Sequence, residues 1–237
     1  MKTRLPLLGL VSVALCVPLL SAAPQAAPAP PVPRFEAAIQ AFLAADLVQP
    51  PPKRAILFVG SSIFRQWSNV AEQMAPLPVV NRAFGGSRTG DLLDRMDQVV
   101  LPYEPRIVVY YCGSNDIKGG RPPEATFEGF RAFSERLRAA LPQTRLVYVS
   151  INRAPEKRDK WDRVDRANQL AREYCAATPL RTYVDVNPAL FDAAGEPRLD
   201  LFQKDRLHLQ PAAYDGFAAI LKPVLESAWA EAQGAPN

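Results

Sequence analysis

The stretch "RIVVYYCGSND" (residues 106–116) carries the strongest structural signal in this chain of 237 residues. It begins with a continuous run of β-branched and aromatic residues and then changes to glycine and small polar residues. A continuous apolar run of this length is typical of a parallel strand that is covered on both faces. The polar residues that follow it are therefore expected at the carboxyl end of a buried strand.

Similar apolar runs lie on both sides of this stretch, and longer segments with helical spacing separate them. The expected strands are residues 55–59, 79–81, 106–111, 145–150 and 181–186. The expected helices are residues 34–49, 63–74, 90–100, 123–140, 161–177 and 211–231. This alternation of strand and helix predicts a three-layer α/β/α fold with a mostly parallel sheet.

The first 23 residues have the layout of a secretory signal peptide. Lys2 and Arg4 precede an apolar run that ends at Leu20, and small residues follow as far as a plausible cleavage point after Ala23. The alternative is a retained membrane anchor, but the run is short for a membrane span and is interrupted by prolines and a glycine. We therefore expect an exported protein, periplasmic or extracellular, without a stable membrane anchor.

Residues 24–33 ("PQAAPAPPVP") form a Pro/Ala-rich stretch with too little apolar variety to pack, and they are interpreted as a linker. The pattern changes at Arg34, where helical spacing of apolar residues begins. Residues 34–237 are therefore expected to form one domain, a normal size for a chain with a substantial core. Nothing in the pattern specifies an oligomeric state.

The composition argues against nucleic-acid binding and against a metal centre. The chain has 28 Lys and Arg against 24 Asp and Glu, two of the basic residues lie in the leader, and the others are scattered. One histidine and two cysteines beyond the leader, Cys112 and Cys175, provide no ligand cluster with zinc spacing. Export would permit a disulfide, but their positions in buried elements favour two free, packed thiols. No metal and no cofactor are expected.

Glycine-containing loops follow three successive strands: "FVGSSIFRQW", "VVNRAFGGSRTG" and "YYCGSNDIKGG". Each loop taken alone has a structural explanation, since a serine can cap a helix and a Gly-Gly pair can form a turn. In parallel α/β sheets, however, ligands bind beyond the carboxyl ends of the strands. Three loops of this kind at one edge of a sheet therefore favour a shared site.

His208, the only histidine of the chain, lies three residues after Asp205 in "DRLH". A serine hydroxyl needs a base to act as a nucleophile, and His208 is the only imidazole available. Asp205 could orient the imidazole ring. Candidate oxyanion donors are the backbone N–H groups of Ser62 and Gly86 and the side-chain amide of Asn115. These residues point to acyl transfer, although the G-x-S-x-G motif of ordinary α/β-hydrolases is absent.

Four blocks of the sequence, "GSS", "NRAFGG", "GSND" and "DRLH", together resemble the SGNH or GDSL hydrolases, a family of serine esterases. The blocks and their surroundings extend from about residue 55 to 221. The resemblance implies a flavodoxin-like sheet of about five parallel strands. It also implies a nucleophilic Ser62, oxyanion donors at Gly86 and Asn115, and a basic His208.

The same resemblance decides between neighbouring residues. The third residue of the first block is the nucleophile in the family, which selects Ser62 over Ser61. The glycine five residues after the asparagine of the second block selects Gly86 over Gly85. Ser61 stands where an aspartate is common in the family. Related bacterial proteins that also have "GSS" in the first block look similar to this chain in the other blocks. Asp116 is interpreted as a residue that holds its loop.

Family members hydrolyse carboxylic esters and thioesters of many kinds, and fold and triad do not choose among them. The connecting loops are short and contain no lid-sized insertion, which favours an open site and a small acyl group. The expected function is that of a short-chain esterase or carbohydrate O-acetylesterase acting on a small-molecule or glycan ester. Arg82, Arg88, Lys118 and Arg121 lie in or beside the site loops, where they could meet such a substrate or be ordinary surface charges.

Two other functions fit the same pattern. A lysophospholipase or thioesterase would use the same residues with a deeper acyl pocket. A non-catalytic protein on this fold could bind envelope glycans without cleaving them, but every catalytic position is filled here. A missing serine or histidine would have indicated a binding module.

Overall fold

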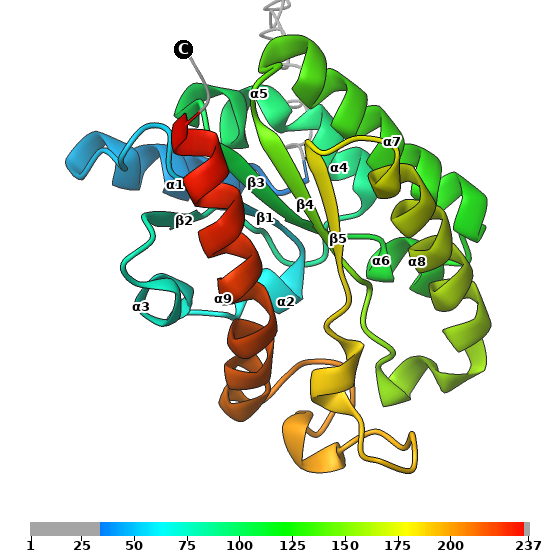
Figure 1. Ribbon diagram of the computed structural model, residues 1–237. Coiled ribbons are helices and arrows are strands. Elements are labelled where there is room, and N and C mark those ends of the chain that lie inside the picture. Colours follow the sequence, from blue (N-terminus) through cyan, green and yellow to red (C-terminus); the bar gives the residue numbers. More distant parts are fainter. Residues whose placement is uncertain (1–33, 235–237) are drawn as a thin grey trace, which may run out of the picture. The chain divides into compact units, whose positions relative to one another are not determined.

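The computed structural model describes residues 34–234 (Figure 1). The predicted signal peptide (1–23) and linker (24–33) lie outside the described residues. Five parallel strands form one sheet in the order β2-β1-β3-β4-β5. Their bounds are β1 (Ile56–Gly60), β2 (Val79–Asn81), β3 (Ile107–Tyr111), β4 (Arg145–Val149) and β5 (Arg181–Val184). The predicted three-layer α/β fold is confirmed.

Helices cover both faces of this sheet (Figure 1). One face packs against α2 (Ser62–Arg65), α3 (Val70–Met74) and α9 (Pro211–Gly234). The other packs against α1 (Glu36–Val48), α4 (Thr89–Asp94), α5 (Met96–Val99), α7 (Pro123–Ala140) and α8 (Trp161–Ala176). The helical elements of residues 34–234 also include the short helix α6 (Ser114–Lys118) and the 3-10 turns Leu101–Tyr103, Pro155–Lys160, Asn187–Leu190 and Leu199–Leu201. None of the helices within residues 34–234 is long and apolar enough to cross a bilayer.

Alternation along the strands divides the core into two halves. Ile56 and Phe58 of β1 belong to the cluster on the α9 side, whereas Leu57 and Val59 belong to the cluster on the α7 side. Successive side chains of a strand point to opposite faces, so a strand covered on both faces must be apolar throughout. This requirement explains why the strands were visible in the sequence as continuous apolar runs.

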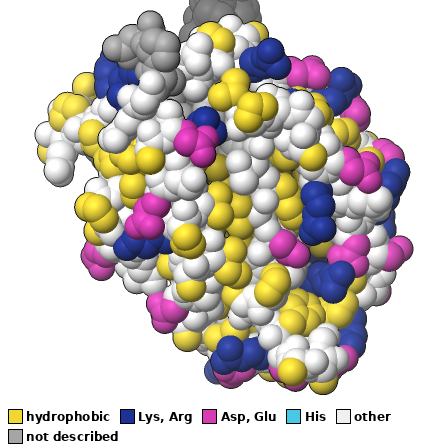
Figure 2. Space-filling model, in the orientation of Figure 1, with side chains coloured by type: hydrophobic (Ala, Val, Ile, Leu, Met, Phe, Trp, Pro, Cys, Tyr) yellow, Lys and Arg dark blue, Asp and Glu magenta, His cyan; other side chains and the backbone are white. Residues whose placement is uncertain are grey.

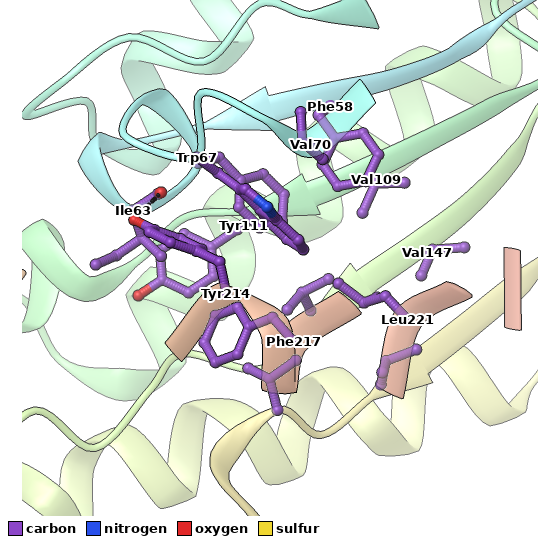
Figure 3. Packing of buried hydrophobic residues seen from close by; sticks show 14 of the residues in the cluster. Phe58, Ile63, Trp67, Val70, Val109, Tyr111, Val147, Tyr214, Phe217 and Leu221 are labelled. Carbon is purple, nitrogen blue, oxygen red and sulfur yellow. Dashed lines mark hydrogen bonds between the residues drawn. The ribbon is translucent and has the colours of Figure 1, made fainter. Parts of the chain in front are cut away.

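A cluster of aromatic side chains lies in the half of the core under α9. Trp67, Tyr214 and Phe217 pack together beside the sheet, and the rings of Trp67 and Tyr214 are stacked with centroids 5.2 Å apart (Figure 3). Such aromatic pairs contribute about 0.5–1.5 kcal/mol beyond the burial of their area. They attach the C-terminal helix firmly to the segment that follows β1.

The segment 63–74 is not one helix, as the spacing predicted, but two short helices separated by residues 66–69. The apolar stripe continues across the gap, because Ile63, Trp67 and Val70 are all buried. Ser68 and Asn69 interrupt the helix itself, since such residues bond to nearby backbone and favour caps and turns. The predicted helix 90–100 is likewise divided, at Arg95, into α4 and α5.

Charged side chains of both signs are interspersed on the face shown in Figure 2, and neither sign dominates it. The two cysteines of the described chain, Cys112 and Cys175, are free and buried, as the sequence predicted. Burial raises the pKa of the Cys112 thiol well above its usual range and that of Cys175 to about 12. Both thiols are therefore protonated at neutral pH and unreactive.

The lack of space for a side chain at Gly60 predicts that a substitution there destabilises the fold. Its φ is +154°, and a Cβ atom added there would lie 2.1 Å from the carbonyl oxygen of Tyr111. Gly60→Ala should therefore lower the free energy of unfolding by roughly 1–3 kcal/mol, measured by urea denaturation. The control is Gly90→Ala in α4, where nothing lies within 4 Å of an added Cβ. The free energy of unfolding of that variant should exceed that of the wild type by up to about 1 kcal/mol. Equal stabilities of the two variants would contradict the prediction.

Candidate active site

The end of β1 places Ser62 at the carboxyl edge of the sheet, as the first residue of α2. This helix has only four residues, so it depends on outside contacts. The hydroxyl of Tyr214 donates to the carbonyl oxygen of Ile63 at 2.8 Å, and the amide of Asn81 donates to that of Phe64 at 2.7 Å. Contacts from α9 and from β2 thus hold the helix that begins with Ser62.

The loops after β1, β2 and β3 are joined to one another at Gly60. Its carbonyl oxygen accepts the backbone N–H of Phe84 at 2.9 Å and the hydroxyl of Ser87 at 3.1 Å. The next residue, Ser61, donates its backbone N–H to the carbonyl oxygen of Tyr111 at 3.2 Å. The three glycine-containing loops therefore meet at one place, as the sequence predicted.

Residues far apart in the sequence form a hydrogen-bonded chain at this place. The Nε2 atom of His208 lies 3.0 Å from the Oγ atom of Ser62, and the Nδ1 atom lies 2.5 Å from a carboxylate oxygen of Asp205. The carboxylate accepts Nδ1–H, which leaves Nε2 free to accept the serine proton. This is the geometry of a nucleophile, a base and an orienting acid.

A tight turn fixes Asp205 against the histidine. The other carboxylate oxygen of Asp205 accepts the backbone N–H groups of Leu207 and His208, each at 3.0 Å. Partial burial acts to raise the pKa of Asp205, but the hydrogen bonds from the His208 ring and from these N–H groups outweigh it and lower the pKa to about 2. Asp205 is therefore ionised at every pH at which the protein would work.

The three candidate oxyanion donors lie around the same cavity. Gly86 has a φ of +79°, a left-handed conformation that favours glycine. The side-chain amide of Asn115 donates one hydrogen to the carbonyl oxygen of Ser87 at 3.0 Å. An amide carries two N–H donors, so the second remains for a ligand. Ser62, Gly86, Asn115 and His208 all line this cavity of about 420 Å³.

Asp116 holds its loop, as the sequence predicted. It is buried, and its carboxylate accepts the backbone N–H of Thr89 at 3.1 Å and the Thr89 hydroxyl at 2.9 Å. Burial raises the pKa of Asp116, while the bonds from Thr89 and the positive charge of Arg121 oppose that effect. Asp116 thus connects the loop after β3 to α4 and does not reach the cavity.

The basic residues named from the sequence do not line the cavity. Arg82 is paired with Asp46 of α1, Lys118 with Glu156 at 2.6 Å, and Arg121 with Asp116 at 3.7 Å. Arg88 has no ion pair among the described residues, but it too lies outside the cavity lining. Two other polar side chains, Arg65 and Gln66, line the cavity, and no motif in the sequence had singled them out. Their spacing of three and four residues from Ser62 on a helix was the available signal.

A buried lysine, Lys157, contacts Ser114, the residue that precedes Asn115. Lys157 is only 2% exposed, and its ammonium group donates to the hydroxyl of Ser114. No carboxylate among the described residues forms an ion pair with it. Burial lowers the pKa of Lys157 to about 8, helped by the charges of Lys118 and Lys160 and opposed by that of Glu156. A cation of this kind is costly to bury.

Comparison with known families gives a match over most of the chain. The model of the GDSL-like lipase/acylhydrolase family matches residues 58–215, a range that contains every residue of the candidate site. A search of curated proteins finds no match.

Several solved structures have the same fold. A GDSL-like lipase from Bacteroides thetaiotaomicron has a TM-score of 0.66 and 21% identity over 80% of this chain and 98% of its own. A carbohydrate esterase family 3 protein from Talaromyces cellulolyticus has a TM-score of 0.63 and 17% identity, over 76% and 99%. An acetyl esterase mutant with an acetate ion has a TM-score of 0.59 and 15% identity, over 73% and 96%. At these identities the similarity establishes the shared fold.

The lowered pKa of Lys157 predicts a pH-dependent contribution to the free energy of unfolding. Because the pKa of Lys157 is about 8 in the folded chain, against 10.5 for an unperturbed lysine, the unfolded chain binds more protons between these two pH values. The unfolding free energy of the wild type should therefore rise, relative to that of Lys157→Met, by up to about 3 kcal/mol from pH 7 to pH 10.5. Urea denaturation at several pH values measures this difference. For the exposed Lys204→Met, the difference should stay nearly constant; a constant difference for Lys157→Met would contradict the prediction.

Proposed function

The chain belongs to the GDSL-like lipase/acylhydrolase family, and from this premise we propose that it hydrolyses carboxylic esters through an acyl-enzyme on Ser62. The observation that carries the proposal is the 3.0 Å contact between Ser62 Oγ and His208 Nε2, with Asp205 on the opposite ring nitrogen. A serine in that contact can lose its proton during attack, which an isolated serine cannot do at neutral pH.

In the first half of the reaction, Ser62 Oγ attacks the carbonyl carbon of the ester while His208 Nε2 takes the serine proton. The ring becomes an imidazolium, and the ionised carboxylate of Asp205 stabilises it. The carbonyl oxygen becomes an oxyanion that accepts the N–H groups of Ser62 and Gly86 and the second amide hydrogen of Asn115. Each such donor contributes roughly 3–4 kcal/mol to the transition state.

The intermediate then collapses to the acyl-enzyme. The bond to the alcohol oxygen breaks, and His208 gives its proton to that oxygen, so the alcohol leaves as a neutral molecule. In the second half, His208 takes a proton from a water molecule, and the resulting hydroxide attacks the acyl carbon. The bond between Ser62 Oγ and the acyl carbon then breaks, and His208 returns its proton to Ser62 Oγ. Release of the carboxylic acid restores the starting state.

The substrate that best fits the cavity has a small acyl group, as in a short-chain ester or an O-acetylated sugar. Among the described residues that line the cavity, Leu207 has the only aliphatic side chain, and the others are polar or glycine. A long acyl chain needs an apolar channel to offset its loss from water, at about 0.8 kcal/mol per CH₂ group. The lining therefore favours acetyl over fatty acyl groups and supports an esterase over a lysophospholipase.

The nucleophile is tested with the p-nitrophenyl esters of acetate, butyrate and octanoate. The wild type should hydrolyse the acetate with the highest kcat/KM. The Ser62→Ala substitution should lower kcat/KM for each ester by at least about 10³-fold. Ser61→Ala is the matched control, because its side chain is buried beside the site without a hydrogen bond to the triad, and it should keep most of the activity.

Labelling with a fluorophosphonate separates the remaining outcomes. Labelling of the wild type but not of Ser62→Ala, without turnover of these esters, would retain the serine mechanism and overturn the preference for small aryl esters. Neither turnover nor labelling would overturn the proposed reaction and leave a binding function on this fold.

Asp205 generates a separate kinetic prediction. Asp205→Asn should lower kcat by about 10²–10⁴-fold, because the imidazolium loses its counter-charge and the ring loses its fixed tautomer. Since the pKa of Asp205 is about 2, its carboxylate takes up no proton at moderately acid pH, and the wild-type kcat/KM should fall there with the slope of no more than a single proton. A slope of two protons, or full activity of Asp205→Asn, would contradict this role.

A further inference from the structure

We propose that Arg65 gives the site a preference for esters that carry a negative charge near the scissile bond. The inference rests on the proposed function and adds a substrate class to it. Arg65 lies three residues after Ser62 in α2 and lines the same cavity as Ser62, Gly86 and His208. Its guanidinium group is the only permanently charged group among the described residues of that lining.

The neighbouring loop provides a seat for the arginine. A Cβ atom added to Gly85 would lie 2.7 Å from Nε and 3.4 Å from Cζ of Arg65, so the side chain rests directly on the Gly85 backbone. The oxyanion role accounts for Gly86 but not for Gly85. The Arg65 side chain explains Gly85, because a Cβ atom at residue 85 would overlap that side chain.

The guanidinium has no acidic partner in the described part of the chain. Arg65 forms neither an ion pair nor a side-chain hydrogen bond there, whereas Arg82, Lys118 and Arg121 are all paired with carboxylates. The cavity lining contains no aspartate or glutamate, and the nearby carboxylate of Asp205 is engaged by His208. An entering anion would therefore meet one available cation and no carboxylate of the lining.

The chemistry of the group indicates its ligand. A planar guanidinium presents paired N–H donors that match the oxygens of a carboxylate or a phosphate. The charged group of the substrate can belong to the alcohol portion or to the acyl portion, because both portions leave the same carbonyl carbon at Ser62. A short, uncharged acyl ester would be hydrolysed without using Arg65.

Two matched pairs of esters test the proposal. With the charge in the alcohol portion, 3-acetoxybenzoate is compared with its neutral methyl ester. With the charge in the acyl portion, the p-nitrophenyl monoester of adipic acid is compared with p-nitrophenyl methyl adipate. The ratio of kcat/KM, charged over neutral, is measured for the wild type and for Arg65→Gln. Intrinsic reactivities cancel when the ratios of the two proteins are compared.

In at least one pair, Arg65→Gln should lower this ratio on the order of tenfold, mainly through KM of the charged ester. Arg65→Lys should recover part of the ratio, because it keeps the charge without the planar pair of donors. High salt should reduce the wild-type ratio but not that of Arg65→Gln, because an exposed charge is screened. The pair that responds identifies the portion of the substrate that Arg65 contacts.

Lys204→Gln is the matched control, since it removes one exposed positive charge next to Asp205 from a residue outside the cavity lining. Its ratios should equal those of the wild type. If Lys204→Gln and Arg65→Gln lowered the charged-over-neutral ratio of kcat/KM equally, a specific role of Arg65 would be overturned. The same conclusion would follow if Arg65→Gln left this ratio unchanged in both pairs of esters. If the wild type hydrolyses none of the four esters and Ser62 is not labelled by a fluorophosphonate, the proposed function itself is overturned.

Discussion

The close approach of β1 to β3 at Gly60 is the constraint on which the whole candidate site depends. There is no room for a side chain at this position, because an added Cβ would lie 2.1 Å from the Tyr111 carbonyl oxygen. The same residue accepts hydrogen bonds from Phe84 and Ser87 of the loop after β2. One glycine thereby sets the distance between the segment that carries Ser62 and the loops that carry the proposed oxyanion donors.

The packing of the core and the positioning of Ser62, the proposed nucleophile, are achieved by the same contacts. A four-residue helix has almost no stability of its own, because nucleation of a helix is unfavourable. The helix α2 is held by the hydroxyl of Tyr214, which lies in the aromatic cluster under α9, and by the amide of Asn81. A loosened core under α9 would therefore move Ser62 relative to His208, although no residue of the proposed triad had changed.

Two cations near the site differ in their solvation, and this difference separates their roles. Lys157 is buried behind the loop of Asn115, where desolvation lowers the pKa of the ammonium group and makes its charge costly. Arg65 is exposed in the cavity, where water and the proposed anionic substrate can both reach it. The first is suited to supporting a loop, and the second to selecting a ligand.

The sequence alone determined the strands, the order of strand and helix, and the loops in which polar residues gather, because burial on two faces leaves a continuous apolar run. The division of the segment 63–74 into two helices could not be predicted from the sequence, because the apolar stripe continues through Trp67 across the break between them. Only the tertiary structure decided which charges reach the cavity. Arg82 lies in a site loop but points to Asp46, whereas Arg65 lies in a helix and rests on Gly85. The reason is physical: periodicity reports which side chains avoid water, but the direction of a charged side chain depends on partners that are distant in the sequence.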